Sequence, residues 1–204
     1  RYSPKWPDGK KHARNVYAHT REECEEKLKA LIAEVKAFSA ADYVKNGFDA
    51  LTAEDTYEFK NPAEEPLEVL KSGKATGPVI GGNLSLISAA VGTPSEMDTE
   101  GKIIFIEEVE EPLTKIEKWT YQLKLAGAFD KCKGVLLGQF TSVSNKYQPE
   151  YDVKKLYEDL LAEYDIPVMY NVQSGHGDKI ITIPFGAACT MNTEDKTIVF
   201  KVER

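Results

Sequence analysis

Residues 102–107, KIIFIE, decide the expected fold, because four apolar residues stand there between a lysine and a glutamate. A short apolar run bounded by charges is typical of a strand that is buried on both faces. Two further runs of this kind follow, GVLLGQF at 134–140 and PVMYNV at 167–172. The sequence therefore predicts three buried strands, which belong to the interior of a sheet.

Between these runs the apolar residues change to helical spacing. Residues 113–126 carry Leu, Ile, Trp, Leu and Ala on one face, and residues 153–164 carry a second such face. A short helix over 84–91 is expected directly after Gly81-Gly82. Strands that alternate with helices predict an α/β fold.

The C-terminal part of the sequence is rich in strand patterns. We expect strands at 180–183, 187–191 and 197–202, with the last two joined across Asn192-Thr193-Glu194-Asp195 as a hairpin. A hairpin pairs its strands antiparallel, whereas strands linked through helices pair parallel. The expected sheet is therefore mixed.

The sequence divides into three stretches. Residues 1–38 predict a small β-hairpin followed by an amphipathic helix, with Pro7-Asp8-Gly9 as the turn. Residues 39–72 are expected to be a linker with irregular structure, because Asn46-Gly47, Asn61-Pro62 and Glu65-Pro66 interrupt them. Residues 73–204 form the expected α/β domain.

Composition narrows the class of protein. The 204 residues are 42% hydrophobic, which is enough for a buried core, and the net charge of −7 disfavours nucleic acid as a partner of the whole chain. No apolar stretch approaches the roughly 20 residues that cross a bilayer, and the first residues lack the apolar centre of a secretory signal. We therefore expect a cytoplasmic protein with no membrane partner.

The three cysteines are Cys24, Cys132 and Cys189, which are far apart and include no CxxC spacing. An odd number at such spacing indicates neither a disulfide framework nor a zinc site. Reduced, mostly buried thiols are the expectation, and no metal site is predicted.

Glu107 and His176 are the residues that best fit acid–base chemistry. Glu107 ends the first buried strand, and α/β folds gather their sites at strand ends. His176 stands between two glycines in SGHGD and is the only histidine after residue 19. Each has a structural alternative: Glu107 begins the acid-rich run EEVEE, which also fits a solvated loop, and His176 also fits a turn residue next to Asp178.

A nucleophile is harder to find. No serine before Glu107 lies on a glycine-flanked turn, and Ser85 and Ser88 fall in an apolar helical stretch where packing is the expected role. Gly82 and Asn83 could present backbone amides to a substrate carboxylate or an oxyanion. Because this stretch lacks both GxGxxG spacing and a phosphate-loop lysine, we expect no cofactor.

Three stretches in order carry a resemblance to a known family: GPVIGGNLSLISAAVGTP (77–94), GKIIFIEEVEEPLTKIEKWTYQLKLAGAFDKCKGVLLGQFT (101–141) and IPVMYNVQSGHGDKIITIPFGAACTM (166–191). From about Lys74 to its end, the chain resembles the C-terminal half of the LD-carboxypeptidase and microcin-immunity serine peptidases. The resemblance implies a mixed-sheet α/β domain of that type over 73–204.

The resemblance also implies a chemistry. Members of the family use a Ser, Glu, His triad in chain order, and the family's glutamate and histidine fall on Glu107 and His176. They release D-alanine from murein tetrapeptides, or cleave related bonds in peptide-nucleotide antibiotics. The family's serine lies in a glycine-tyrosine-serine-aspartate turn of an N-terminal domain, and this motif does not occur here. The resemblance therefore implies a chain that is inactive alone and acts on its peptide substrate together with a nucleophile domain.

The opening segment, residues 1–37, is similar to the hairpin-and-helix arm-binding domain of phage-type tyrosine integrases. In that domain basic residues meet DNA phosphates, which here would be Lys5, Lys10, Lys11 and Arg14. A DNA-binding module joined to a non-catalytic acidic body is therefore the alternative function. A third hypothesis is an inactive remnant whose exposed apolar face favours a homodimer.

Overall fold

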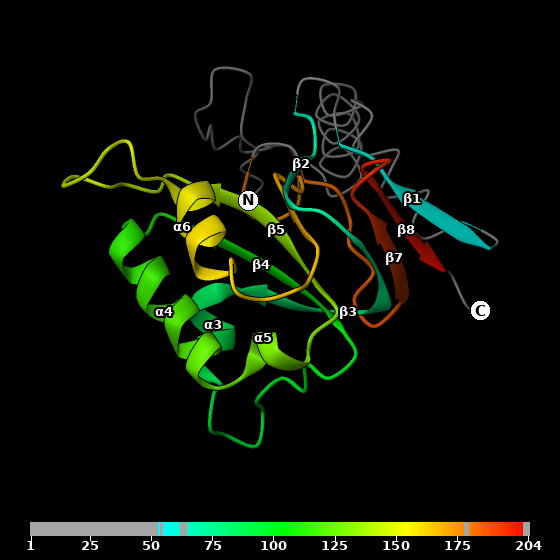
Figure 1. Ribbon diagram of the computed structural model, residues 1–204, viewed down its shortest axis with the longest axis horizontal. Coiled ribbons are helices and arrows are strands. Elements are labelled where there is room, and N and C mark those ends of the chain that lie inside the picture. Colours follow the sequence, from blue (N-terminus) through cyan, green and yellow to red (C-terminus); the bar gives the residue numbers. More distant parts are fainter. Residues whose placement is uncertain (1–52, 54, 62–64, 178–179, 202–204) are drawn as a thin grey trace, which may run out of the picture. The chain divides into compact units, whose positions relative to one another are not determined.

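The computed structural model describes residues 53, 55–61, 65–177 and 180–201, all within the unit Asn46–Arg204. Among these residues eight strands form one sheet in the order β1-β8-β7-β3-β4-β5-β6-β2 (Figure 1). The strands are β1 (Thr56–Phe59), β2 (Glu68–Lys71), β3 (Lys74–Asn83), β4 (Ile103–Val109), β5 (Gly134–Thr141), β6 (Val168–Tyr170), β7 (Ala188–Asn192) and β8 (Thr197–Lys201). The helices are α3 (Leu84–Ala89), α4 (Leu113–Leu125), α5 (Ala128–Lys131) and α6 (Val153–Leu160).

The long strand β3 joins two differently built parts of the sheet. Its first half pairs antiparallel with β7, from Lys74 opposite Asn192 to Pro78 opposite Ala188. Its second half pairs parallel with β4, and the last pair places Asn83 opposite Glu107. β4, β5 and β6 continue the parallel part, while β7, β8 and β1 are antiparallel. This confirms the predicted mixed α/β sheet.

The four helices cover one face of the parallel strands (Figure 1). Ile104 and Ile106 of β4 and Leu137 of β5 point toward them and are fully buried, together with Ile116 of α4 and Tyr157 of α6. Burial of one such side chain contributes roughly 1.5–3 kcal/mol to folding. On the opposite face residues 172–177 and 180–187 lie against the strands, where the Phe185 ring lies 5.9 Å from the Phe105 ring. The strand ends are thus held between two layers.

The interpretation of residues 39–72 as linker and irregular structure is wrong for two segments. β1 alternates exposed and buried residues, buries Tyr57 and Phe59 and pairs with β8. β2 pairs antiparallel with β6 at the other edge of the sheet. Both strands have only four residues, and Glu65-Pro66 stands between them without preventing either one.

The strand predicted at 180–183 is also wrong. Ile181 and Ile183 are buried while Ile180 and Thr182 are exposed, so the apolar alternation is real. The segment forms no ladder among the described residues, and the Ile181 amide donates to the Gln173 carbonyl at 2.8 Å. The alternation reflects the packing of a covering loop, because such a loop can bury every second side chain as a strand does.

The remaining predicted strands and helices are confirmed with small shifts at their ends, and β7 and β8 form the expected hairpin. No helix in the described part of the chain is long and apolar enough to cross a membrane. The hairpin-helix module at 1–38 lies outside the described residues, as do Cys24 and the boundary after residue 38. The basic residues Lys5, Lys10, Lys11 and Arg14 lie outside them too, so the DNA-binding alternative stays a prediction.

Candidate active site

The alternation of β4 determines where Glu107 points. Ile104 and Ile106 face the helices, so Phe105 and Glu107 face the covering residues 172–177 and 180–187. The Glu107 side chain is only 6% exposed. The alternative that Glu107 belongs to a solvated loop is therefore wrong, because the strand continues through it to Val109.

His176 meets this carboxylate from the covering segment. Its Nδ1 lies 2.6 Å from Glu107 Oε2. Because a carboxylate can only accept, Nδ1 carries the hydrogen and donates, and a bond of this length is of the strong, charge-assisted kind. The His176 side chain is 53% exposed, and Nε2 makes no hydrogen bond to a described residue. The imidazole is therefore anchored through Nδ1, while about half of the side-chain surface is exposed.

Glycine allows the histidine loop to pass close to the carboxylate. Gly175 has φ +135°, a conformation that other residues rarely adopt. A Cβ at this position would lie 2.9 Å from Glu107 Oε2. A glycine before His176 therefore lets the backbone of the histidine loop approach the Glu107 carboxylate closely.

An irregularity in β5 brings a third polar side chain to the site. The pairing of β4 with β5 shifts between Ile106 and Glu108, so that Leu137 and Phe140 both lie toward the helices. A bulge of this kind re-aims the residue it inserts. Gln139 is therefore turned to the Glu107 face, where its Oε1 accepts from the Gly177 amide at 2.8 Å.

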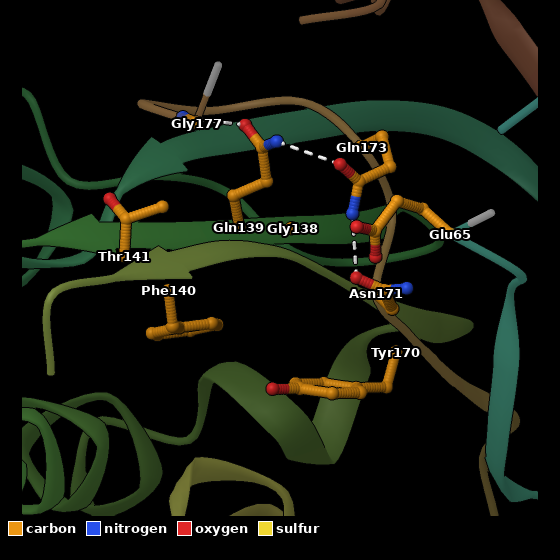
Figure 2. A pocket seen from close by; sticks show the side chains of 9 residues that line it. All are labelled: Glu65, Gly138, Gln139, Phe140, Thr141, Tyr170, Asn171, Gln173 and Gly177. Carbon is orange, nitrogen blue, oxygen red and sulfur yellow. Dashed lines mark hydrogen bonds between the residues drawn. The ribbon is translucent and has the colours of Figure 1, made fainter. Parts of the chain in front are cut away.

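A cavity of about 350 Å³ adjoins this loop at the ends of β5 and β6 (Figure 2). Its walls include Glu65, Gln139, Tyr170 and Gln173. Burial, and less strongly the carboxylates of Asp152 and Glu68, raises the pKa of Tyr170, which keeps its hydroxyl protonated at neutral pH. The Thr141 hydroxyl also borders the cavity and finds no hydrogen-bond partner among the described residues. Among the described residues, the lining of this cavity includes the acid Glu65 and no basic side chain.

Gly82 and Asn83 lie beside the site, but Asn83 is engaged in local structure. Its Oδ1 accepts from the Leu86 amide and caps α3, while its Nδ2 donates to Glu108 Oε1 at 2.7 Å. Gly82 has open space on its Cβ side. Their role in substrate binding stays a prediction.

Neither serine of α3 is placed as a nucleophile. Ser85 donates to Asn83 Oδ1, and the buried Ser88 donates to Gln122 Oε1. Among the described residues no hydroxyl hydrogen-bonds to His176, and no cluster of three or more His, Cys, Asp or Glu side chains could hold a metal ion. The described site is therefore an imidazole and a carboxylate without a hydroxyl on Nε2.

Two polar neighbours of the Glu107–His176 pair were not among the predicted site residues. Glu108 is 3% exposed and accepts from Asn83 Nδ2 and from the Ser85 and Val109 amides, so it supports α3 beside the site. Gln139 links β5 to the histidine loop. The available signal was a polar residue inside an apolar run, as in LLGQF, because such a residue must find a partner when the strand is buried.

Comparison with known proteins identifies the type of domain. The family model for the LD-carboxypeptidase C-terminal domain matches residues 76–191. The chain is 36% identical over 137 residues to the “Probable murein peptide carboxypeptidase” of Bacillus subtilis, a match that covers 67% of this chain and 43% of that protein. It is 33% identical over 133 residues to the microcin C7 self-immunity protein MccF of Escherichia coli, covering 62% and 37%. The chain thus spans less than half the length of these two relatives.

Solved structures agree on the fold. The muramoyltetrapeptide carboxypeptidase from Oxalobacter formigenes superposes with a TM-score of 0.65 at 23% identity, covering 80% of this chain and 55% of that one. MccF in complex with glutamyl sulfamoyl guanosine gives a TM-score of 0.69 at 23% identity, covering 79% and 56%. These likenesses place the described sheet and helices in the same architecture as those two proteins.

Proposed function

We propose, from the premise that this chain belongs to the LD-carboxypeptidase family through its C-terminal domain, that Glu107 and His176 are two members of a Ser-Glu-His triad. The observation that supports this role is the 2.6 Å hydrogen bond between His176 Nδ1 and Glu107 Oε2. The serine of this triad is supplied by a separate nucleophile domain, in keeping with relatives of which the matched part is only 43% and 37% of the length.

In this mechanism His176 acts as general base through Nε2. It takes the proton of the serine hydroxyl as the oxygen attacks the amide carbonyl, and it returns that proton to the leaving amine. Glu107 keeps the hydrogen on Nδ1 and stabilises the imidazolium that forms. Its low exposure suits this role, because water screens a buried charge less.

The substrate class follows from the family. We infer that the bond cleaved is the amide to a terminal D-alanine in a murein tetrapeptide, or a related bond in a peptide-nucleotide conjugate. Relatives named murein peptide carboxypeptidase and microcin immunity protein support both classes. The chain contributes the base and its partner carboxylate, so hydrolysis requires the nucleophile domain as well.

Release of D-alanine from murein tetrapeptide tests this function. The purified chain is incubated alone, and then with a separately produced N-terminal half of a family member. We expect no release by the chain alone and release by the mixture. His176→Ala should lower that rate by about 10⁴-fold or more, and Glu107→Gln by about 10⁴-fold, the losses that triad members cause in serine peptidases.

A matched control keeps the assay specific. Lys155→Ala removes an exposed ion-pairing residue of α6 and should leave the rate of the mixture unchanged. Release that survives His176→Ala would contradict the proposal, as would a mixture that forms a stable complex yet releases nothing. Release by the chain alone that is lost in His176→Ala would show that the serine lies within this chain.

A further inference from the structure

A chain of side-chain amides runs from the histidine loop to the segment before β2, and Figure 2 shows its part from Gly177 to Asn171. The Gly177 amide donates to Gln139 Oε1 at 2.8 Å, and Gln139 Nε2 donates to Gln173 Oε1 at 2.9 Å. Gln173 Nε2 then donates to Asn171 Oδ1 at 2.6 Å, and Asn171 Nδ2 donates to the Pro66 carbonyl at 3.0 Å. Every amide in this series donates in the same direction.

The two ends of the chain fix that direction. The Gly177 N–H can only donate, and the Pro66 carbonyl can only accept. Turning over any one of the three side-chain amides would set two donors or two acceptors against each other at both of its contacts. Gln139 and Gln173 are 8% and 6% exposed, so water cannot easily replace a lost partner, and a broken contact is costly.

Gln139 holds the histidine loop on both sides of His176. Its backbone amide donates to the Ser174 carbonyl at 2.9 Å, two residues before the histidine. Its side chain accepts from Gly177, one residue after it. A Cβ at Gly177 would lie 2.1 Å from Gln139 Nε2, which shows how closely the loop lies on this side chain. The backbone around His176 is therefore attached to β5 at two points.

We propose that Gln139 is a positioning residue that holds the loop of His176 so that Nδ1 stays directed at Glu107. This inference depends on the proposed triad, because it assigns how the base of that triad is oriented. Gln139 acts through the loop and through His176, and it contributes no proton transfer of its own. The amide chain adds rigidity, since its other end is fixed beside β2.

The test replaces Gln139 by leucine, which has similar size and neither amide end. Proton NMR at low temperature detects the His176 Nδ1 hydrogen as a far-downfield resonance while it is held against Glu107. We expect this resonance to broaden or disappear in Gln139→Leu. Hydrogen exchange at the Gly177 amide should become about fivefold faster or more, the effect of one lost neutral hydrogen bond.

A matched control separates this effect from lost stability. Gln122 on α4 also uses both amide ends, donating to the Ser88 carbonyl and accepting from the Ser88 hydroxyl. Gln122→Leu therefore removes comparable bonds away from His176. It should leave both the Nδ1 resonance and the exchange of Gly177 as they are in the unchanged protein.

A conservative variant provides the rescue. Gln139→Glu retains an oxygen that can accept from Gly177 but places a second acceptor against Gln173 Oε1, so it keeps the contact with the loop and loses the link to Gln173. Exchange at Gly177 should therefore be slower than in Gln139→Leu, and the Nδ1 resonance should reappear. If Gln139→Leu does not fold, this variant decides the question, because a lost resonance together with a protected Gly177 amide would overturn the proposal.

The outcomes also distinguish this proposal from the triad itself. If the unchanged protein gives no Nδ1 resonance, the proposed function fails. If it gives one, and Gln139→Leu keeps it with unchanged exchange at Gly177, the positioning role of Gln139 is overturned while the triad stands.

Discussion

Gly175→Ala places a methyl group against the carboxylate that anchors His176. Gly175 has φ +135°, and a Cβ there would lie 2.9 Å from Glu107 Oε2 and 3.2 Å from Glu107 Cβ. The oxygen it approaches is the one that accepts from His176 Nδ1. This substitution therefore perturbs the pair without changing either of its members.

The size of the effect follows from two terms. An L-residue held at such a φ costs on the order of 1–3 kcal/mol. Ordinary van der Waals contacts begin near 3.4 Å, whereas the new Cβ would lie 2.9 Å from Oε2. The carboxylate must therefore move away by about 0.5 Å. It has little space for this, since its side chain is 6% exposed. Overpacking adds roughly 1–3 kcal/mol, for a loss of about 2–6 kcal/mol in the free energy of unfolding.

Two measurements check this expectation against a matched control. Gly82 has φ +140° and no atom within 4 Å of its Cβ position, so Gly82→Ala introduces similar strain without a contact. Denaturant unfolding should show a larger loss for Gly175→Ala than for Gly82→Ala. The downfield Nδ1 proton resonance should weaken or shift only in Gly175→Ala. Equal unfolding losses together with an unchanged resonance would refute the reasoning.

Three further predictions concern the support of the site and the buried thiols. Glu108→Gln should lower the free energy of unfolding by about 1–3 kcal/mol, because the new NH₂ replaces one of two carboxylate oxygens that each accept from an N–H donor. No loss in denaturant unfolding would contradict this. Burial raises the pKa of Cys132 to about 11 and of Cys189 to about 12, so both should resist alkylation at pH 8 until the protein is denatured, as peptide mass mapping would show. A raised folded-state pKa gives stability that is complete below the ordinary value of 9.0 and is lost as the pH rises toward 11–12. The unfolding free energy should therefore fall by about 2 kcal/mol for each thiol, about 4 kcal/mol for the two, between pH 8 and pH 10.5, and a constant value would contradict this.

The interior of the fold was predictable because its signals are local. The run KIIFIE needs burial on both faces wherever it stands, and the stripe over α4 has helical spacing. The edge strands were not predictable, since β1 and β2 have four residues each and gain their structure from β8 and β6. Residues 180–183 have the pattern of a strand for a related reason. They form a loop that covers the sheet, and this contact buries every second side chain.

The site divides in the same way. Glu107 and His176 could be identified as candidates from strand-end position, flanking glycines and family resemblance, and the fold brings them together. Gln139 stands out in the sequence only as a polar residue inside an apolar run, and its orientation toward the site depends on a bulge that is defined by the register of β4 against β5. The backbone amides of Gly82 and Asn83 stay a predicted substrate contact, whereas the contacts of the Asn83 side chain with α3 and Glu108 could not be read from its neighbours in sequence.

The tautomer of His176 is the most direct test of the triad role. Nitrogen-15 NMR of labelled protein at neutral pH reports which ring nitrogen carries the hydrogen. A base that works through Nε2 must be protonated at Nδ1, against Glu107, and bare at Nε2, with this preference lost in Glu107→Gln. A ring that carries its hydrogen on Nε2, or that keeps the same tautomer in Glu107→Gln, would show that the carboxylate does not orient the histidine.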